Sequence, residues 1–523
     1  MEKKKKLIIL AIITLTLVII GTTYAILTWT STKINLGLNS GCFTINYTKG
    51  QDISGNLKLL NESDLISNNK FTIKNGIGIS AVNIGINSTC TIEGYGSIYL
   101  NVTNISDAFT AGDSKGALKY AVLSNTSTIT TPSSVTVDSL LNQSFDIVST
   151  GSITSNDTIT LLTKQLSNTE IYKYLVVIYV DNALAGNSIT SATFAGNISA
   201  DANQGKAPYV GLAKDIQDLY VNADKTIVTN NSINYEYDTT NNLMQDVDGN
   251  IRYYGASPNN YVYFNCSDYA NQTSSTCELW RIIGVFDGKV KLIRGSKIGT
   301  YSWDNKDTTT GASSDYGKND WTDARLMKLL NPGYDSETIG GSLYYNAGSG
   351  TCYSGQNNAT TTCNFNSTGI KNDTTRGLIS DTTYYLGGCG RKQIYPNQVY
   401  EYERGTEVSS GRPTTWQGKV AIPYPSDYGY AADLDKCNQI LYNYNDSTCK
   451  SNNWMKNIMS GVIWLLTPRL VSYDAWYIHT TGAFNYYTGV YYNNGVMPVL
   501  YLDSKLTIKS GTGSSSEPYQ LDV

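Results

Sequence analysis

The chain begins with MEKKKKLIILAIITLTLVIIGTTYAILTWTSTK, in which Lys3 to Lys6 precede a run that carries no charge until Lys33. The part from Leu7 to Ile20 is almost wholly aliphatic, and the uncharged run is long enough to cross a hydrocarbon core of about 30 Å. Lysines on the N-terminal side hold that end in the cytoplasm, so the remainder of the chain is exported. This segment therefore requires the rest of the protein to fold outside the cytoplasm.

Two fates of the apolar segment stay open. In the first, residues 1–34 comprise the cytoplasmic lysines and a retained signal-anchor transmembrane helix, and residues after about 33 are extracellular. In the second, the segment is a secretory signal that is cleaved near Ala25, and the protein is secreted. Trp29 and the other apolar residues beyond Ala25 favour a single-pass anchor, with the cell membrane as a partner.

The composition suits an extracellular surface protein. Charged residues make up 16% of the chain, below the usual share of about a quarter, while tyrosine reaches 41 residues. The net charge is only −4, and no basic patch follows the apolar segment. Nucleic acid is therefore excluded as a partner.

Nine cysteines in an exported chain indicate disulfides, with reduced thiols as the alternative. Each of three local pairs would close a loop of about a dozen residues and stabilise the fold by about 2–3 kcal/mol. These pairs are Cys266 with Cys277, Cys352 with Cys363, and Cys437 with Cys449. Cys42 and Cys90 are the only pair upstream, and Cys389 is left over. No C-x-x-C motif is present, and one histidine cannot complete a Cys/His zinc box.

About 490 exported residues are too many for one core, so at least two domains are expected. Residues 35–205 consist of short runs rich in Val, Ile, Thr and Tyr, such as YKYLVVIYVD (172–181), separated by Gly, Asn and Ser. Alternation with a period of two is common in them and is typical of strands with one buried face. We expect a β-sandwich over this range.

Two short segments resemble the camelysin and TasA family of bacterial surface proteins. GTTYA (21–25) is similar to the end of the family's lysine-rich signals, and TFAGNISADANQ (193–204) is similar to the last strand of its domain. The resemblance supports the sandwich and a surface location. The family's protease activity does not carry over, because the chain lacks a set of zinc ligands.

The C-terminal half differs from residues 35–205 in its amino-acid composition. Residues 206–244 are expected to be a linker with a short helix, whereas seven of the eight tryptophans lie after residue 244. ELWRIIGVFDGKVKLIRGS (278–296) predicts a hairpin that turns at Asp287-Gly288. NDWTDARLMKLLNPG (319–333) predicts a helix that is capped by Asn319 or Asp320. Residues 509–523 are expected to be a polar tail.

A succession of segments between 245 and 508 carries a second resemblance. In chain order they are NIRYYGASPNNYVYFNC, LWRIIGVF, NDWTDARLMKLLN, GRPTTWQGKVAIPYPSDYGYA, WLLTP and GVMPVLYL. They resemble a widespread family of uncharacterised bacterial surface domains that is related to C-type-lectin-like folds. The stretch IPYPSDYGYAAD (422–433) is also similar to an element of sulfatase-modifying-factor-like domains of that fold.

This resemblance implies a compact α+β domain over 245–508 that is used for binding in most relatives. The chain departs from the pattern at Met497, where an arginine often stands, so an arginine-anchored ligand contact is not implied there. No cysteine follows Cys449, so the copper-dependent oxidase activity of the formylglycine-generating enzymes is not implied either.

Catalytic chemistry finds little support in the sequence. A hydrolase triad would need His479, the only histidine, as its base, and Asp474 is the only nearby carboxylate. No spacing singles out a carboxylate pair for glycoside hydrolysis. We expect no catalytic residue and no enzyme.

Calcium is the one cofactor that the sequence raises. Asp246, Asp248 and Asn250 place oxygens on alternate positions around a glycine, which is half of a calcium loop without its bidentate glutamate. The competing interpretation is a solvated turn. We expect no metal site and no other cofactor.

The stretch SYDAWYIHTTGAFNYYTGVYY (472–492) is the candidate ligand-binding region. It mixes aromatic rings with Ser, Thr, Gly and Asn, as adaptable recognition surfaces do. Neighbours along a strand face opposite sides, so Tyr477 and His479 are expected to point outward. The alternative is a set of cross-strand pairs that only stabilise a sheet. The candidate ligand-binding residues are Tyr473, Tyr477, His479, Tyr486, Tyr487, Tyr491 and Tyr492.

The sequence thus predicts a mainly β protein with a transmembrane helix, a β-sandwich stalk and a C-type-lectin-like α+β head. The leading functional hypothesis is a membrane-anchored, adhesin-like bacterial surface protein that binds a glycan or a protein through its tyrosine-rich face. The alternative is a structural component of a surface fibre or matrix that assembles through the sandwich.

Overall fold

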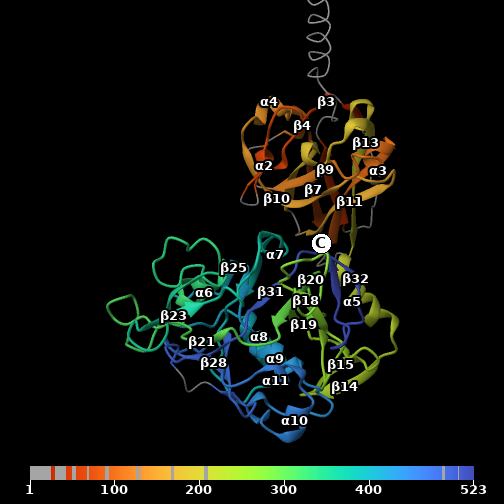
Figure 1. Ribbon diagram of the computed structural model, residues 1–523. Coiled ribbons are helices and arrows are strands. Elements are labelled where there is room, and N and C mark those ends of the chain that lie inside the picture. The colour runs from red at the N-terminus through yellow and green to blue at the C-terminus, as the bar shows by residue number, and fades with distance from the viewer. Residues whose placement is uncertain are drawn as a thin grey trace, which may run out of the picture. The chain divides into compact units, whose positions relative to one another are not determined.

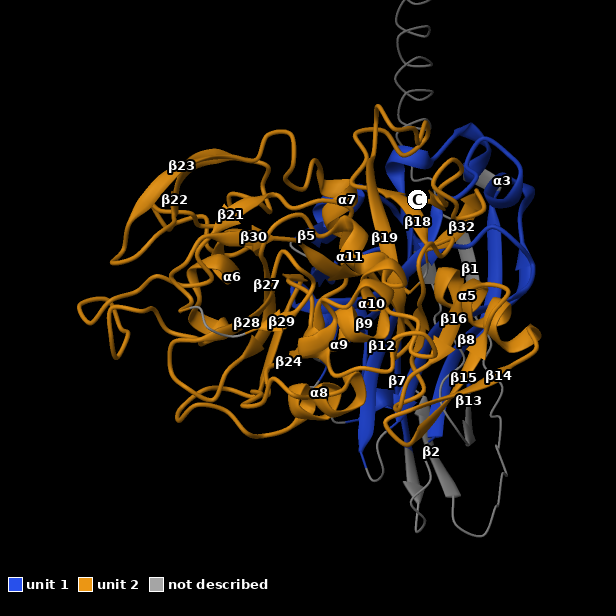
Figure 2. Cartoon of the chain, turned by 90° about the horizontal axis from the view of Figure 1, so that it is seen from below, with its two compact units in different colours: residues 1–208 blue, residues 209–523 orange. Residues whose placement is uncertain are grey.

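The computed structural model describes residues 25–29, 43–49, 55–67, 70–88, 94–124, 126, 129, 131–166, 170–204, 210–485, 489–504 and 506–523. In these residues strands predominate over short helices, which confirms the predicted mainly β class. The chain divides into two compact units, Met1–Pro208 and Tyr209–Val523 (Figure 2).

The first unit contains two sheets that share a core (Figure 1). One sheet has the order β11 (Thr158–Leu166), β8 (Gly94–Ile105), β13 (Thr193–Gln204), β1 (Ala25–Trp29), β3 (Gly55–Leu57). The other has the order β2 (Phe43–Lys49), β7 (Gly78–Ser88), β12 (Ile171–Asp181), β9 (Leu118–Ser124), β10 (Ser144–Ser152), β6 (Lys70–Thr72), β5 (Ile66–Ser67), with β4 (Leu59–Leu60) beside β12.

Strand β12 shows how the sequence builds this unit. Val176 and Ile178 point into the core between the sheets, whereas Val177 and Tyr179 point to a second core on the opposite face. The second core lies under short helices and strand β6, so β12 is buried on both faces and its apolar run is almost continuous. The helices of this unit are α2 (Glu62–Leu65), α3 (Asp107–Thr110), α4 (Val137–Leu140) and the 3-10 helices η1 (Pro132–Ser134), η2 (Asn182–Leu184) and η3 (Asn187–Ser191).

Strand β1 corrects part of the predicted anchor. Residues 25–29 pair in parallel with β13, with Ile26 opposite Thr193, and antiparallel with β3. The predicted helix over 1–34 therefore does not include residues 25–29, and the rest of that range lies outside the described residues. From Ala25 onward, no described helix combines the length and the apolar character that crossing a membrane requires.

The second unit contains two larger sheets and three hairpins. The larger sheet has the order β14 (Thr226–Asn230), β15 (Ile233–Asp238), β16 (Leu243–Gln245), β17 (Ile251–Tyr253), β19 (Glu278–Phe286), β20 (Lys289–Arg294), β31 (Val499–Tyr501), β26 (Val420–Ala421), with β18 (Tyr261–Phe264) beside β19. The other has the order β21 (Gly299–Tyr301), β30 (Asn494–Val496), β27 (Ile463–Pro468), β28 (Ala475–Ile478), β29 (Phe484–Asn485).

The hairpins and helices of the second unit surround these sheets. The hairpins are β22 (Ser349–Tyr353) with β23 (Thr360–Asn364), β24 (Thr382–Tyr385) with β25 (Thr415–Gly418), and β32 (Thr507–Ser510) with β33 (Gln520–Asp522). The helices are α5 (Gly211–Asn222), α6 (Arg325–Leu330), α7 (Asp373–Gly377), α8 (Pro396–Arg404), α9 (Pro425–Tyr430), α10 (Ser447–Ser451), α11 (Trp454–Ile458), η4 (Trp321–Asp323) and η5 (Leu441–Asn443).

The expected linker and tail are parts of the second unit. Within 206–244, helix α5 buries Leu212 and Ile216 against the larger sheet, and β14, β15 and part of β16 extend that sheet. Within 509–523, β33 pairs with β32 and buries Leu521. Both stretches are polar on average, but some of their residues are buried by partners that lie far away in the chain. The average composition therefore does not indicate that they are part of the fold.

The predicted hairpin over 278–296 is correct, while the predicted helix over 319–333 is shorter than expected. Asp287 and Gly288 have φ of 48° and 76°, which is the left-handed backbone that a tight hairpin turn requires. Asp320 accepts a hydrogen bond from the backbone N–H of Thr322 and caps η4, but Ala324, at ψ 139°, interrupts the helix before α6.

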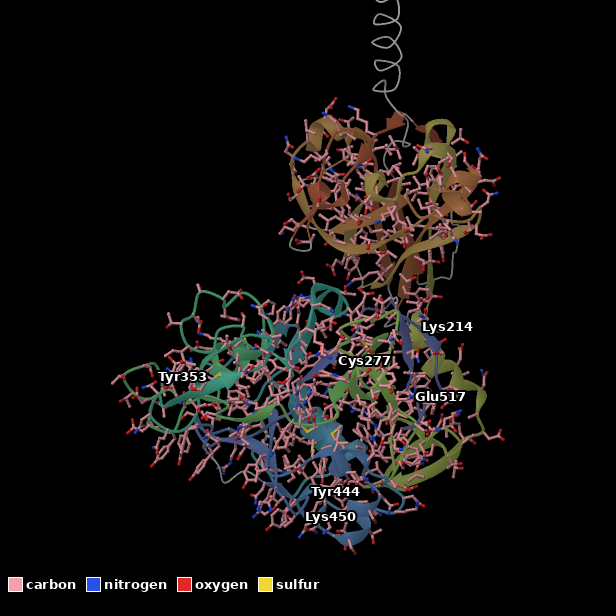
Figure 3. All side chains as sticks on the ribbon, viewed as in Figure 1. Lys214, Cys277, Tyr353, Tyr444, Lys450 and Glu517 are labelled. Carbon is pink, nitrogen blue, oxygen red and sulfur yellow. A yellow bond between two sulfur atoms is a disulfide. The ribbon has the colours of Figure 1, made fainter. Side chains whose placement is uncertain are left out.

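The three local disulfides are confirmed. Cys266 is bonded to Cys277 (labelled in Figure 3), Cys352 to Cys363, and Cys437 to Cys449. The predicted pair of Cys42 and Cys90 lies outside the described residues. Cys389 is a buried free thiol, and burial raises the pKa of that thiol to about 12.

Cys389 is therefore expected to resist alkylation in the folded protein. A pKa near 12, against the ordinary value of about 8.5, reduces the thiolate fraction at neutral pH by about three orders of magnitude. Iodoacetamide labelling followed by peptide mass spectrometry should modify Cys389 only after unfolding in guanidinium chloride. Rapid labelling of Cys389 in the native protein would contradict this expectation.

A buried charge cluster joins β17, β20 and α9. Arg252 Nε lies 2.6 Å from Asp246 Oδ2, and Arg252 Nη1 lies 3.3 Å from Asp427 Oδ1. Lys291 Nζ lies 2.6 Å from Asp427 Oδ2, and these four side chains are at most 1% exposed. Although burial opposes ionisation, Lys291 and Arg252 hold the pKa of Asp427 below its ordinary value.

Candidate functional site

Four tyrosines gather on the surface of the second unit, and we call them the tyrosine cluster. The rings of Tyr316 and Tyr473 are 5.3 Å apart between centroids, and those of Tyr316 and Tyr491 are 5.8 Å apart. Tyr491 stacks on Tyr492 at 4.3 Å. Tyr316 is 45% exposed and Tyr492 49% exposed, so the cluster is partly open to solvent. Burial and the neighbouring Tyr492 raise the pKa of Tyr491 to about 12, so its hydroxyl is a neutral donor at physiological pH.

The loop that carries Tyr473 is held by one buried amide. The Nδ2 group of Asn319 donates to the carbonyls of Arg469 (3.0 Å), Val471 (2.6 Å) and Asp474 (2.8 Å). The backbone N–H of Asn319 also donates to the carbonyl of Ser472 at 3.1 Å. Asn319 is 1% exposed, so these bonds are shielded from water and fix the backbone on both sides of Tyr473.

The loop that carries Tyr316 is held by Asp304. This buried carboxylate accepts hydrogen bonds from the backbone N–H groups of Lys318 at 2.9 Å and Arg325 at 3.3 Å, and it lies 3.2 Å from Lys306 Nζ. Gly317 adopts φ +87°, and a Cβ there would lie 2.4 Å from the carbonyl of Asp304. The glycine next to Tyr316 therefore permits the close approach that brings the ring to Tyr473.

The structure brings together three of the predicted binding residues and places Tyr477 and His479 elsewhere. Tyr473, Tyr491 and Tyr492 belong to the tyrosine cluster. Tyr477 was expected to point outward but is 6% exposed and packs edge-on against Trp464. Because β28 lies between β27 and β29 with both faces covered, the alternation of its residues does not distinguish an outer face.

His479 lies at the opposite end of β28 from Tyr473. Its Nδ1 atom is 3.0 Å from Thr481 Oγ1 and accepts the backbone N–H of Thr481 at 3.3 Å, within the turn from β28 to β29. A Cβ at Gly482 in this turn would lie 3.0 Å from the carbonyl of Tyr444 and 3.2 Å from Lys450 Cγ, residues labelled in Figure 3. The strand between them spans about 13 Å, so His479 does not join the tyrosine cluster. Tyr486 and Tyr487 lie outside the described residues.

A small recess adjoins the tyrosine cluster. Its space of about 190 Å³ free of atoms includes open solvent, and its sheltered part has room for about one water molecule, far less than a usual ligand pocket. Its lining residues are Asn319, Asp320, Trp321, Leu386, Arg412, Pro413 and Pro468. A second recess, with about 210 Å³ of space free of atoms, lies beside Tyr353. Figure 3 labels Tyr353 and shows it far from Tyr444 and Lys450.

Arg412 connects the recess to the cluster. Its Nη2 group donates to the carbonyl of Ser472 at 3.2 Å, and its Nε group lies 3.3 Å from Asn319 Oδ1. Ser472 immediately precedes Tyr473, so the recess and the tyrosine cluster share one loop. Sequence reasoning missed both Tyr316 and Arg412, because nothing local links them to a loop that lies 60 to 157 residues away.

The acidic stretch that raises calcium in the sequence serves as a structural turn. Asp246 Oδ1 accepts the backbone N–H groups of Asp248 and Asn250 at 3.0 Å each, and its Oδ2 pairs with Arg252. Asp304 is occupied by Lys306 and backbone donors, as described above. In the part of the chain that the structure describes, no group of three or more His, Cys, Asp or Glu side chains is placed to hold a metal ion.

Comparisons with protein-family models, with curated proteins and with solved structures gave no match for this chain.

Proposed function

We propose that this protein is a membrane-anchored bacterial surface protein that binds a glycan through the tyrosine cluster. The observation that carries the proposal is the position of four partly exposed side chains, those of Tyr316, Tyr473, Tyr491 and Tyr492. Asp304 fixes the loop of Tyr316, and Asn319 fixes the loop of Tyr473. Exposed aromatic side chains on a rigid support lose little conformational entropy when a partner stacks on them.

The sequence supplies the cellular setting of this proposal. Lys3 to Lys6 would hold the N-terminus in the cytoplasm, and the uncharged apolar run that precedes β1 would anchor the chain in the membrane. The second unit would then act as a C-type-lectin-like head, and the first unit as a β-sandwich stalk. Three disulfides in the second unit suit an oxidising exterior.

The tyrosine cluster can be tested by truncating its two most exposed rings. Full-length protein in detergent should bind members of a glycan array, and Tyr316→Ala combined with Tyr492→Ala should weaken that binding about 30-fold or more. The melting temperature should stay unchanged, because these rings are 45% and 49% exposed.

Tyr442→Ala provides a matched control. Tyr442 is also exposed, at 36%, but it stands outside the cluster and lies near Lys392. The control should bind as the wild type does. Equal binding by the double variant and the wild type would refute the cluster as the binding surface. Fibre formation by the full-length protein without glycan binding would instead favour the structural alternative, assembly through the first unit.

A further inference from the structure

One residue that lines the recess beside the tyrosine cluster carries a buried donor without a partner. Trp321 lines it and is 2% exposed, and its indole nitrogen has no hydrogen-bond partner. It is one of ten buried side-chain nitrogen and oxygen atoms among the described residues that lack a partner, and water or a ligand group can supply one. Leu386, Pro413 and Pro468 form apolar walls around the same recess.

Arg412 places an unpaired positive charge at this recess. Its Nε and Nη2 groups are directed to Asn319 Oδ1 and to the carbonyl of Ser472, so neutral acceptors position the guanidinium. Among the described residues, no carboxylate lies within ion-pair distance of Arg412. The nearest candidate in the lining, Asp320, instead lies 3.1 Å from Lys318 Nζ and accepts the Thr322 hydroxyl at 2.6 Å.

The recess thus offers donors and positive charge, while the carboxylate in its lining is already occupied. A group that complements it must accept hydrogen bonds, carry negative charge and place little more than one atom in its sheltered part, which has room for about one water molecule. A whole sugar ring is too large for that space, but a carboxylate substituent can place one oxygen in it. Arginine is the side chain best suited to a carboxylate, because its planar fork matches the two oxygens.

We propose that this recess binds the carboxylate of an acidic sugar, of the uronic or sialic acid type, while the tyrosine cluster contacts the adjoining sugar rings. The inference rests on the proposed glycan-binding function and names its ligand class. The shared loop supports the pairing, because Arg412 donates to Ser472 and the next residue is Tyr473 of the cluster.

Two matched pairs of probes test the proposal with full-length protein in detergent. Sialyllactose is compared with lactose, and tetragalacturonate with its methyl ester, by isothermal titration calorimetry. At least one acidic probe should bind about 10-fold or more tightly than its neutral partner, and the difference should shrink as salt rises from about 0.05 to about 0.5 M.

Variants of the recess should remove this preference selectively. Arg412→Gln should abolish the difference between acidic and neutral probes, Arg412→Lys should restore part of it, and Trp321→Phe should weaken acidic binding about 5-fold while keeping an aromatic ring in the core. Arg391→Gln is the charge-matched control, since Arg391 is exposed and does not line the recess. The control should keep the full preference.

The outcomes separate the two proposals. Neutral glycans that bind through the tyrosines, without an acidic preference, would overturn the carboxylate inference and leave glycan binding intact. An acidic preference that survives Arg412→Gln would also overturn the inference. The lack of any glycan ligand, acidic or neutral, would overturn both.

Discussion

Replacing Asp427 with asparagine is expected to destabilise the second unit by about 3–5 kcal/mol, the largest effect of any single substitution considered for this protein. Asp427 contacts Arg252 Nη1 at 3.3 Å and Lys291 Nζ at 2.6 Å, and it also accepts the backbone N–H of Tyr424 at 3.0 Å. The asparagine has nearly the same size, so the change removes charge without opening a cavity. Arg252 would then keep one carboxylate partner, Asp246, while Lys291 would lose its only ion-pair partner among the described residues.

Urea unfolding followed by tryptophan fluorescence would measure this loss. Seven of the eight tryptophans lie in the second unit, so the signal reports mainly on that unit. Asp373→Asn is the matched control, because Asp373 pairs with Arg376 at 2.6 Å but is 99% exposed. The control should change stability by less than about 0.5 kcal/mol. A similarly small change for Asp427→Asn would show that the buried ion pairs do not stabilise the fold.

A double-mutant cycle adds a second test of the same cluster. Lys291→Met removes the cation that lies closest to Asp427. In the double variant, Asp427→Asn with Lys291→Met, Arg252 is the one cation of the cluster that has lost a carboxylate partner. We expect the double variant to be at least about 1 kcal/mol more stable than the sum of the two single effects predicts. Additive effects would contradict a direct interaction between Lys291 and Asp427.

Features set by local sequence could be predicted. The β19–β20 hairpin follows from the Asp287-Gly288 turn between two apolar runs, because the left-handed backbone of the turn is available to those residues at low cost. The three disulfides join cysteines separated by 11 or 12 residues, so loop closure favours them over distant partners.

Features set by distant partners could not be predicted. Tyr235 and Tyr237 of β15 alternate with polar residues in a stretch that resembles a loose linker. They are buried because Tyr430 and Tyr254 pack against them, at centroid distances of 6.0 and 4.1 Å. Only the fold brings Tyr430 to Tyr235 across nearly two hundred residues, and the local pattern contains no trace of that contact.

The tyrosine cluster shows the same limit at a candidate site. The aromatic content of 472–492 pointed to Tyr473, Tyr491 and Tyr492, but the same content included Tyr477, which belongs to the core. Amino-acid composition does not show whether an aromatic ring is covered by a neighbouring strand or exposed on a loop. Tyr316 joins the cluster only because Asp304 and Gly317 bend its loop toward Tyr473.

Asn319 contributes both to the stability of the second unit and to the proposed binding site. Asn319→Ala should destabilise the second unit by about 2–4 kcal/mol, because the carbonyls of Arg469, Val471 and Asp474 lose a buried donor. The same change frees the loop of Tyr473 and removes the acceptor of Arg412 Nε. Binding of sialyllactose or tetragalacturonate, whichever the wild type prefers, should therefore weaken about 30-fold or more at temperatures where the variant stays folded.

Asn331→Ala separates the effect on binding from the effect on stability. Asn331 is 2% exposed, and its amide donates to the carbonyls of Met327 and Val420 at 2.9 and 2.8 Å, away from the tyrosine cluster. This control should lose a similar amount of stability, measured by urea unfolding, yet keep the wild-type affinity for the same probe. If Asn319→Ala also kept that affinity, the fixed position of Tyr473 would be irrelevant to binding. If both variants lost affinity equally, the loss would follow from reduced stability and not from the geometry of the site.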